Sequence, residues 1–299
     1  MISARLRQGG PGGGIAVFYL FALPFAALTL VFGLWPIALG IEVSFTESAT
    51  ALKPFPNFVG LANYFSVFAD PLFVASLWRT LLYAVLAVIA NVGLALAVAL
   101  LLNSRLIGPG RTVFKLLLFL PVVTPDVAGY VVWRWLYDQS FGAVNAALTG
   151  IGLPAFGGIA SPHTAMLAVL LAELWHHAGF YVVIFLANLA ICERALEEAA
   201  DIDGARSWQK TLYVVLPQLR PAIVINTVYA LIQFLKTFTV VVVTTKGGPN
   251  GATNFLSYYA WRFFDEARYG EATAMGTILF AIVLLVALSV YALGERGRA

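Results

Sequence analysis

Charged residues are scarce in this chain. Only 11% of its 299 residues are Asp, Glu, Lys or Arg, whereas 61% are hydrophobic and the mean hydropathy is +0.86. So few charges cannot cover the surface of a water-soluble globule, which excludes an ordinary soluble domain. A single cysteine, Cys192, excludes an intrachain disulfide. The natural solvent for such a chain is a lipid bilayer.

Long hydrophobic runs fill most of the chain. A helix that crosses the hydrocarbon core needs about 20 mainly apolar residues, because every backbone amide must be satisfied inside the segment. Six runs meet this requirement, which predicts an all-α polytopic membrane protein with one transmembrane domain over residues 15–293. The predicted spans lie near 15–40, 76–102, 113–136, 164–189, 222–243 and 272–293.

The two ends of the chain are predicted to be short and simple. Residues 1–14 are rich in glycine, which predicts a flexible lead, and residues 294–299 form a short tail. The first hydrophobic run is too long for a cleavable signal peptide and is not followed by a small-residue cleavage site. We therefore expect it to remain as a helix.

Basic residues indicate the orientation in the membrane. Lys and Arg resist translocation, so the loops that hold more of them face the cytoplasm. Most of the 18 basic residues fall at the termini and in two loops: Arg5, Arg7, Arg105, Arg111, Lys115, Arg194, Arg206, Lys210, Arg220, Arg296 and Arg298. Both termini and the loop over residues 193–220 are thus predicted to be cytoplasmic. The net charge of +3 reflects this bias and does not indicate a nucleic-acid partner.

One crowded polar stretch stands out in the second half of the chain. It contains "EEAADIDGARSWQKTLYVVLPQLRP", from Glu197 to Pro221. Good helix formers precede Gly204, which predicts a short helix, a turn and a second short helix. Charge content alone fits a solvated loop, whereas the small side chains beside Gly204 let a helix backbone approach another protein closely. Composition leaves both alternatives open.

The order of residues in this stretch resembles a known motif. The motif runs from Glu198 to Pro217 and reads EAA, three residues, G, nine residues, V, one residue, LP. This pattern is similar to the EAA loop of permease subunits of binding-protein-dependent ABC importers. Isoleucine is usual where Val214 stands. The resemblance implies that the loop is a coupling helix that docks into a partner ATPase. The coupling residues that it implies are Glu198, Ala199, Ala200, Asp203, Gly204, Ala205, Leu216 and Pro217.

Four further segments resemble landmarks of the same family. They are "FVGLANYFSVFADPLF" (58–73), "LPVVTPD" (120–126), "YDQSFGAVN" (137–145) and "TKGGPNGAT" (245–253). Their order is that of the carbohydrate-uptake branch, which includes maltose-type and glycerol-phosphate-type permeases. The similarity starts near Ile15 and covers nearly the whole remaining chain. It implies the MetI-like fold, a core of five transmembrane helices with an extra N-terminal helix, in which two homologous permeases pair.

The sequence lacks a phosphate-binding loop. No GxxxxGK[ST] string occurs, and Lys246-Gly247-Gly248-Pro249 is better interpreted as a turn on the outer side. We therefore expect no cofactor in this chain and no enzymatic activity. ATP and Mg²⁺ are expected to bind to a separate ABC ATPase.

Several ionisable residues lie within the predicted spans, where they are costly and usually face a cavity or a partner. Glu173, His176 and His177 share one helix face, as metal ligands can, but no HExxH order and no third ligand set is evident. No metal site is therefore expected. Pairing across helices and lining the solute route remain open for each polar residue.

The family resemblance implies which polar residues meet the solute. The implied contacts are Asp126, Glu173, His176, His177, Gln233, Phe234, Lys236 and Thr237. Amides, carboxylates and aromatic rings suit the hydroxyls and apolar ring face of a sugar. Lys236 suits a phosphate, whereas Asp126 and Glu173 would repel one, so a neutral sugar or polyol is favoured over a glycerol-phosphate-type solute.

The predicted function is that of a permease subunit of an ATP-driven ABC importer for a carbohydrate-like solute, in a bacterial or archaeal cytoplasmic (inner) membrane. The expected partners are a second homologous permease, an ABC ATPase dimer, membrane lipid and an extracytoplasmic solute-binding protein, contacted through residues 42–72 and 138–162. An ion-coupled secondary transporter could use Asp126, Glu173 and the histidines as a proton relay, but the EAA pattern has no purpose there. A membrane enzyme is disfavoured, because Ser161-Pro162-His163 lacks the context of an activated nucleophile.

Overall fold

The computed structural model describes residues 11–49, 56–104 and 110–296. Within these ranges every regular element is a helix, and the β-type pairing is limited to one antiparallel bridge between Thr46 and Phe58. The predicted all-α class is therefore confirmed. The predictions for residues 1–10 and 297–299 and for Arg105 lie outside the described residues.

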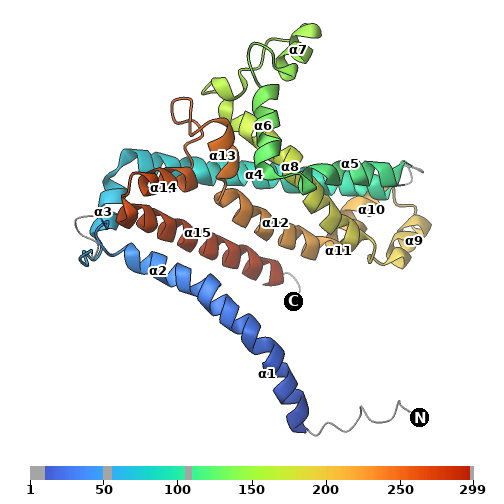
Figure 1. The fold of residues 1–299 in the computed structure, drawn as a ribbon. Helices are drawn as coiled ribbons and strands as arrows, with labels where there is room; N and C mark the ends of the chain where they lie inside the picture. The colour runs from blue at the N-terminus through green and yellow to red at the C-terminus, as the bar shows by residue number, and fades with distance from the viewer. Residues whose placement is uncertain (1–10, 50–55, 105–109, 297–299) are drawn as a thin grey trace, which may run out of the picture.

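The first predicted span is a continuous helical rod that stands apart from the bundle in Figure 1. It consists of α1 (Pro11–Leu28), a π-helical turn η1 (Thr29–Leu34) and α2 (Trp35–Val43). Its apolar part, Phe18–Val43, has a mean hydropathy of 2.0, and none of it is buried. Within the described residues, α1 already includes residues 11–14 of the segment for which a flexible lead is predicted.

Four long helices form the centre of the molecule: α4 (Pro71–Asn103), α8 (Ala165–Leu189), α12 (Arg220–Leu235) and α15 (Tyr269–Arg296). Helix α4 packs against α8 and α12, and α12 packs against α15. The buried face of α4 is lined by small side chains, including Ala84, Ala87, Ala95 and Ala99. In a membrane, small residues let helix backbones approach closely, and this is what holds such bundles together.

The third predicted span is one segment in sequence and two helices in space. Helix α5 (Arg111–Val123) and helix α6 (Asp126–Leu136) meet at an angle of 101°. Pro125 has no N–H to continue the first helix, and it favours the extended backbone seen at Thr124, with ψ 134°. The span predicted over residues 113–136 therefore corresponds to a bent pair of helices.

The fifth predicted span is also broken. Helix α12 ends at Leu235, and a short helix α13 (Thr239–Thr244) follows after a turn at Lys236, so the span predicted over 222–243 was too long. At its other end α12 bends by 68° from the preceding helical segment. Within the described residues four helices are long and apolar enough to span a membrane, or six when each bent pair counts as one span.

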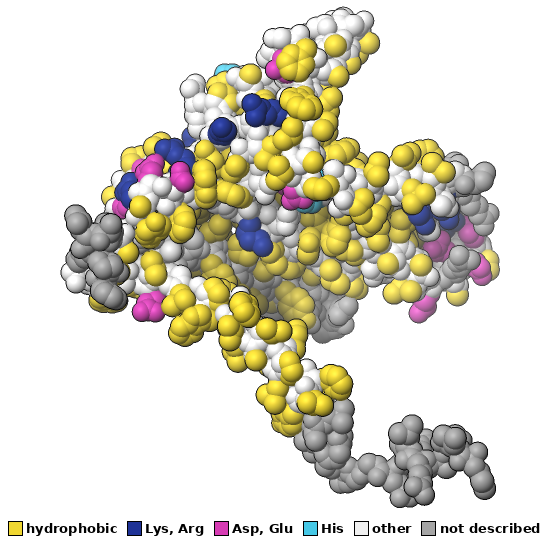
Figure 2. Space-filling view, viewed as in Figure 1, with side chains coloured by type: hydrophobic (Ala, Val, Ile, Leu, Met, Phe, Trp, Pro, Cys, Tyr) yellow, Lys and Arg dark blue, Asp and Glu magenta, His cyan; other side chains and the backbone are white. Residues whose placement is uncertain are grey.

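Shorter helices lie at the end of the bundle opposite to the predicted coupling loop. They are α3 (Ala62–Ala69) and α14 (Leu256–Asp265), and a projecting arm carries α7 (Ala143–Gly150) and the 3₁₀ turn η2 (Gly158–Ala160) (Figure 1). In Figure 2 hydrophobic side chains cover most of the visible face, and most charged side chains gather toward its two ends. This distribution fits a chain whose middle lies in hydrocarbon.

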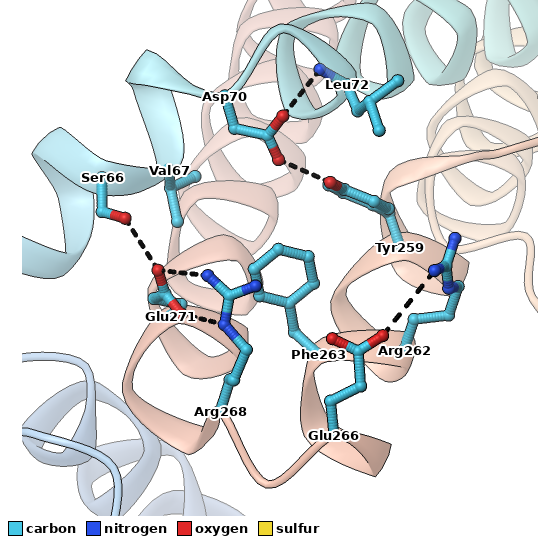
Figure 3. A pocket seen from close by; sticks show the side chains of 10 residues that line it. All are labelled: Ser66, Val67, Asp70, Leu72, Tyr259, Arg262, Phe263, Glu266, Arg268 and Glu271. Carbon is cyan, nitrogen blue, oxygen red and sulfur yellow. Dashed lines mark hydrogen bonds and ion pairs between the residues drawn. The ribbon is translucent and has the colours of Figure 1, made fainter.

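A polar clasp ties these short helices to the long ones (Figure 3). The Tyr259 hydroxyl donates to Asp70 at 2.5 Å, and Glu271 accepts from both Ser66 and Arg268. Burial and the neighbouring Asp70 carboxylate raise the pKa of Tyr259, so its hydroxyl remains a donor at neutral pH. The small cavity beside the clasp, about 290 Å³, is lined by charged groups that already pair with one another. We interpret the clasp as a structural link between α3, α14 and α15.

The glycine-rich segment 245–253 forms a compact turn. The Thr253 hydroxyl donates to the Gly248 carbonyl at 2.8 Å, and its oxygen lies 2.7 Å from the Thr245 hydroxyl oxygen. Gly247 has φ +78°, and a Cβ there would lie 2.7 Å from the Tyr258 ring. Backbone conformation and packing therefore explain why glycine stands at position 247, without a phosphate-binding role for the turn.

Candidate functional site

The polar stretch folds into a helical hairpin at the end of the bundle where α8 finishes and α12 begins. Helix α9 (Arg194–Ile202) is followed by a turn, α10 (Ser207–Lys210), the π-helical segment η3 (Thr211–Val215) and α11 (Leu216–Gln218). The first four residues of α9 include acidic Glu197, which suits the positive end of a helix dipole. The sequence prediction of two short helices separated by a turn is confirmed in outline.

Gly204 makes the turn between the two helices. Its φ of +76° is in the left-handed region, which glycine adopts without cost. The Ala205 amide donates to the Ala200 carbonyl at 2.9 Å, and the Gly204 amide donates to the Asp201 carbonyl at 3.1 Å. This pair of bonds is a Schellman motif, which satisfies carbonyls that the end of α9 would leave unpaired. The glycine of the motif therefore has a clear role in the backbone.

Side-chain bonds fix the hairpin further. Lys210 of α10 donates to Asp201 of α9 at 2.7 Å, and the Gln209 side chain accepts from the Arg206 amide at 2.8 Å. At its base, the Gln218 side chain accepts from the Glu193 amide at 2.9 Å. The two helices thus present one defined surface.

That surface is open to solvent in the isolated chain. Glu198, Ala199, Asp203, Gly204 and Pro217 are exposed, while Ala200, Ala205 and Leu216 are partly buried. Apart from Gly204 and its two neighbours in sequence, no atom of the described residues lies within 4 Å of the position that a Gly204 Cβ would take. Large apolar side chains stand out among the charges: Ile202 is 87% exposed and Trp208 is 57% exposed. Apolar residues exposed on a polar hairpin are typical of a surface that another protein covers.

The second group of predicted residues meets in the middle of the molecule, where α6 and α12 contact α8. His176 Nε2 lies 3.0 Å from Asp126 Oδ1, and His177 Nε2 lies 3.5 Å from Glu173 Oε2. Two adjacent histidines therefore pair with two different carboxylates. Among the described residues no three His, Cys, Asp or Glu side chains are arranged to hold a metal ion.

An aromatic layer surrounds these pairs. The Phe234 ring of α12 lies 5.9 Å from the His177 ring, and Tyr83 and Tyr181 pack on Phe234 from α4 and α8. Thr237 is buried beside the end of α12. The hydroxyls of Tyr83, Tyr181 and Thr237 are buried without a hydrogen-bond partner among the described residues. Buried hydroxyls are normally satisfied, so this region is suited to hold water or solute hydroxyls when the helices move apart.

Burial divides the predicted solute contacts into two sets. The Asp126 side chain is 53% exposed, Lys236 is exposed, and Gln233 and His177 are partly exposed. Glu173, His176, Phe234 and Thr237 are buried. The structure brings Asp126, Glu173 and the two histidines together, but it gives no side-chain bond for Gln233 or Lys236.

Sequence reasoning missed two residues of this cluster. The Tyr130 hydroxyl donates to Glu173 Oε1 at 2.7 Å, and Gly129 lies against Trp175 and His176. A signal was present, because Tyr130 follows Asp126 by four residues and so shares its helix face. An aromatic residue in an apolar run, however, looks like ordinary core in sequence.

Comparison with known proteins identifies the family. Residues 11–298 match the family described as "binding-protein-dependent transport system inner membrane component". The chain belongs to this family. The match covers almost the whole chain, so this permease crosses the inner membrane several times, as its helices also indicate.

Curated relatives extend over the same length. The permease is 30% identical over 280 residues to the trehalose/maltose transport system permease protein MalF of Thermococcus litoralis, with 94% of each chain covered. It is 32% identical to the sn-glycerol-3-phosphate transport system permease protein UgpA of Yersinia pestis, covering 93% of this chain and 94% of the relative. It is also 32% identical to the diacetylchitobiose uptake system permease protein NgcF of Streptomyces coelicolor, covering 89% and 78%.

A solved structure matches the fold of the permease. A crystal structure of a bacterial ABC transporter involved in the import of the acidic polysaccharide alginate superposes with a TM-score of 0.82, covering 94% of this chain and 95% of that chain at 24% identity. At this identity the match concerns the fold alone. Together with the family match, it confirms the predicted MetI-like fold.

Proposed function

We propose that this permease is the membrane subunit through which an ATP-driven importer moves a carbohydrate-like solute. The family assignment supports a role in binding-protein-dependent transport. The relatives that handle trehalose and maltose, diacetylchitobiose and glycerol-3-phosphate all carry solutes rich in hydroxyl groups, which supports the class of solute. The half-exposed Asp126 beside an aromatic layer fits such a solute.

The α9–α10 hairpin is the proposed docking site for a separate ATPase. The observation that supports this most directly is the empty space beside Gly204, at the centre of a rigid hairpin with exposed Ile202 and Trp208. A groove on the partner could accept the hairpin tip because no side chain projects there. In this proposal ATP and Mg²⁺ bind to the partner, and the chain itself carries no cofactor.

The mechanism that fits these parts is alternating access. ATP-driven closure of two ATPase subunits would displace α9, and α8 would transmit the movement because it leads into α9 at Glu193. A loaded binding protein can shift the equilibrium only by binding the outward-facing form better. We place the termini and the hairpin in the cytoplasm, and we place residues 42–72 and 138–162 on the outer side, where the binding protein would touch them.

A second homologous permease completes the proposed complex. Helix α1 and most of α5 present apolar side chains to the outside of this chain: Phe18, Leu20, Phe21, Val113, Leu116 and Leu117 are all more than half exposed. Lipid or a second membrane chain can cover such faces. The proposed pairing needs only part of them, and membrane lipid would cover the rest.

A glycerol-phosphate-type solute is the second candidate. Lys236 is exposed at the end of α12, and a cation there suits a phosphate. The exposed Asp126 carboxylate opposes it. We therefore favour a neutral sugar or polyol.

The proposal is tested by isolating the complex and measuring uptake. The chain, tagged at its C-terminus, is purified gently from native membranes and its companions are identified by mass spectrometry. We expect an ABC ATPase and a second permease. Proteoliposomes of this complex with its binding protein are then tested with radiolabelled maltose, trehalose, diacetylchitobiose and glycerol-3-phosphate. A single monodisperse protein without companions would contradict the proposal, and the ion-coupled alternative would replace it.

A further inference from the structure

Helices α6 and α8 meet along a narrow line of contact. On α6 it is formed by Asp126, Gly129 and Tyr130, which lie on one face because their spacings are three and four residues. On α8 it is formed by Glu173, Trp175 and His176. We call these six residues the α6–α8 seam. Its contacts are Asp126 with His176, Gly129 with Trp175 and His176, and Tyr130 with both Glu173 and the His176 ring.

Gly129 lies where α6 and α8 approach each other in the seam. A Cβ at this position would lie 3.4 Å from Trp175 Cζ3 and 3.7 Å from His176 Nδ1. These distances leave room for a single methyl group and for nothing larger. The close approach lets the Tyr130 hydroxyl reach Glu173 at 2.7 Å and His176 reach Asp126 at 3.0 Å.

The seam holds the first turn of α6 against α8, while Trp133 and Tyr137 hold the rest of α6 to Trp175 and Ala168 of α8. Helix α6 leaves α5 at an angle of 101° through Thr124 and Pro125. The two helices therefore do not form one continuous rod, and α5 does not fix the direction of α6. On its other side α6 packs against α13. Loss of the seam would therefore free the first turn of α6, which carries Asp126.

Exposure assigns different roles to the members of the seam. Tyr130, Glu173 and His176 are 1%, 4% and 3% exposed, so they do not meet a solute in this conformation. The Asp126 side chain is 53% exposed, and its Oδ1 atom faces His176. A carboxylate held through one oxygen keeps the lone pairs of the other oxygen for a further donor, such as a sugar hydroxyl.

Glu173 supplies most of the strength of the seam. It is the one carboxylate that is buried among the described residues, and a buried carboxylate is costly without partners. Its partners are the Tyr130 hydroxyl on one side and His177, at 3.5 Å, on the other. Removing the Tyr130 hydroxyl would leave Glu173 with its weaker partner alone.

We propose that Gly129, Tyr130, Glu173 and His176 are positioning residues, which act by holding the Asp126 carboxylate in the solute route, and that Asp126 is the member of the seam that contacts solute. This inference rests on the proposed function, because it assumes that Asp126 faces the solute. It adds two residues, Gly129 and Tyr130, that sequence analysis did not select, and it removes Glu173 and His176 from direct solute contact.

The first test is a stability cycle, which does not depend on transport. The apparent melting temperature of the purified complex is measured for Tyr130→Phe, Glu173→Leu and the double variant. Since both single changes break the same bond, the double variant should melt at the same temperature as Glu173→Leu. Tyr229→Phe, at a half-exposed position of α12, is the control and should melt like the wild type. Additive shifts would overturn the seam.

The second test is an uptake cycle with the four radiolabelled probes. A hydrogen bond to a charged group contributes about 1.5–3 kcal/mol, so Tyr130→Phe should lower uptake about tenfold or more. If Tyr130 acts only through Asp126, adding Tyr130→Phe to Asp126→Ala should lower uptake no further. A merely structural tyrosine would lower it again in the double variant, and that result would overturn the positioning role.

A conservative variant provides the rescue. Glu173→Gln keeps an oxygen that accepts from Tyr130, so it should retain uptake within about threefold, whereas Glu173→Leu, of similar size, should lose it. Equal loss in both would mean that the charge itself, and not the bond to Tyr130, is required, which would overturn the inference. If the wild type imports none of the four probes, the proposed carbohydrate function fails and the role of Asp126 fails with it, while the stability cycle still decides whether the seam exists.

Discussion

Substitutions at Gly204 separate the two things that this glycine does. Its φ of +76° means that any side chain strains the turn, and the empty space around its Cβ position means that any side chain projects into the proposed docking surface. Three variants divide these effects. Gly204→Ala adds strain with little bulk, Gly204→Asn adds bulk with little strain because asparagine tolerates this region, and Gly204→Glu adds both.

The structure sets the size of each effect. A left-handed alanine costs about 1–2 kcal/mol, so the intact turn should become less populated by a factor of about 5–30. The membrane bundle should be unaffected, because in the described part of the chain only the two adjacent residues lie near the new Cβ. The amount of inserted permease should therefore equal that of the wild type in all three variants. Loss of function should appear in the complex.

The assay is the yield of ATPase that is purified with the tagged permease, together with solute uptake. We expect Gly204→Glu to retain almost no ATPase, and Gly204→Asn to retain less than Gly204→Ala, since a groove that fits a bare backbone excludes bulk more strongly than it penalises strain. If Gly204→Asn and Gly204→Glu both keep the ATPase and transport like the wild type, the space beside Gly204 is not an interface and the docking argument is refuted. If Gly204→Ala alone fails, the glycine serves the turn only.

Three further changes test other parts of the structure. Lys210→Ala removes a half-exposed ion pair with Asp201. Such pairs contribute about 0–1 kcal/mol, so uptake should fall by no more than about fivefold, and a complete loss would mean that Lys210 contacts the ATPase itself. Tyr259→Phe removes the bond to Asp70 in the clasp and should lower the apparent melting temperature of the complex by a few degrees without changing its composition. Size-exclusion chromatography after heating would detect this shift. An unchanged melting temperature would contradict the structural role of the clasp. Gly179→Ala places a methyl group against the Leu118 carbonyl, so it should reduce the amount of folded permease. Gly93→Ala on α4 is the matched control, because the described residues leave space for its methyl group, and it should be neutral or slightly stabilising. Equal yields of the two variants would contradict the close packing of α5 on α8.

Hydropathy was sufficient to locate the membrane helices in the sequence, but it did not predict where they bend or break. Runs of apolar residues located α4, α8 and α15 within a few residues of their ends, because solvation by lipid depends on composition. The same runs hid the bend at Pro125 and the end of α12 at Leu235. Hydropathy is an average over a window of residues, so it carries no information about a change in the direction of the helix axis. Pro125 was visible in the sequence, but a proline in a membrane helix produces anything from a slight kink to a right angle, and packing decides between them.

The coupling hairpin was predictable because its signals are local. The end of α9 is encoded by Gly204 and by the bonds that a left-handed glycine permits within five residues. The intramembrane cluster depends instead on contacts between distant residues. That Glu173 and His177 share a helix face follows from spacing, but the pairing of His176 with Asp126, 50 residues away, does not. Tyr130 has a polar function through one oxygen atom on an otherwise apolar side chain, and neither composition nor periodicity reports where that atom points.

Burial explains why a resemblance alone groups residues with different roles. The eight predicted solute contacts include Glu173 at 4% exposure and Asp126, whose side chain is 53% exposed, although both are carboxylates in the same cluster. A buried carboxylate is tolerated only when its partners stay in place, so Glu173 is suited to hold helices together in a fixed arrangement. An exposed carboxylate tethered by a histidine can exchange water for a hydroxyl group at little cost, so Asp126 is suited to bind a solute that must also leave. A transporter needs both properties within a few ångströms, because a site that binds weakly is selective only if the groups around it do not move.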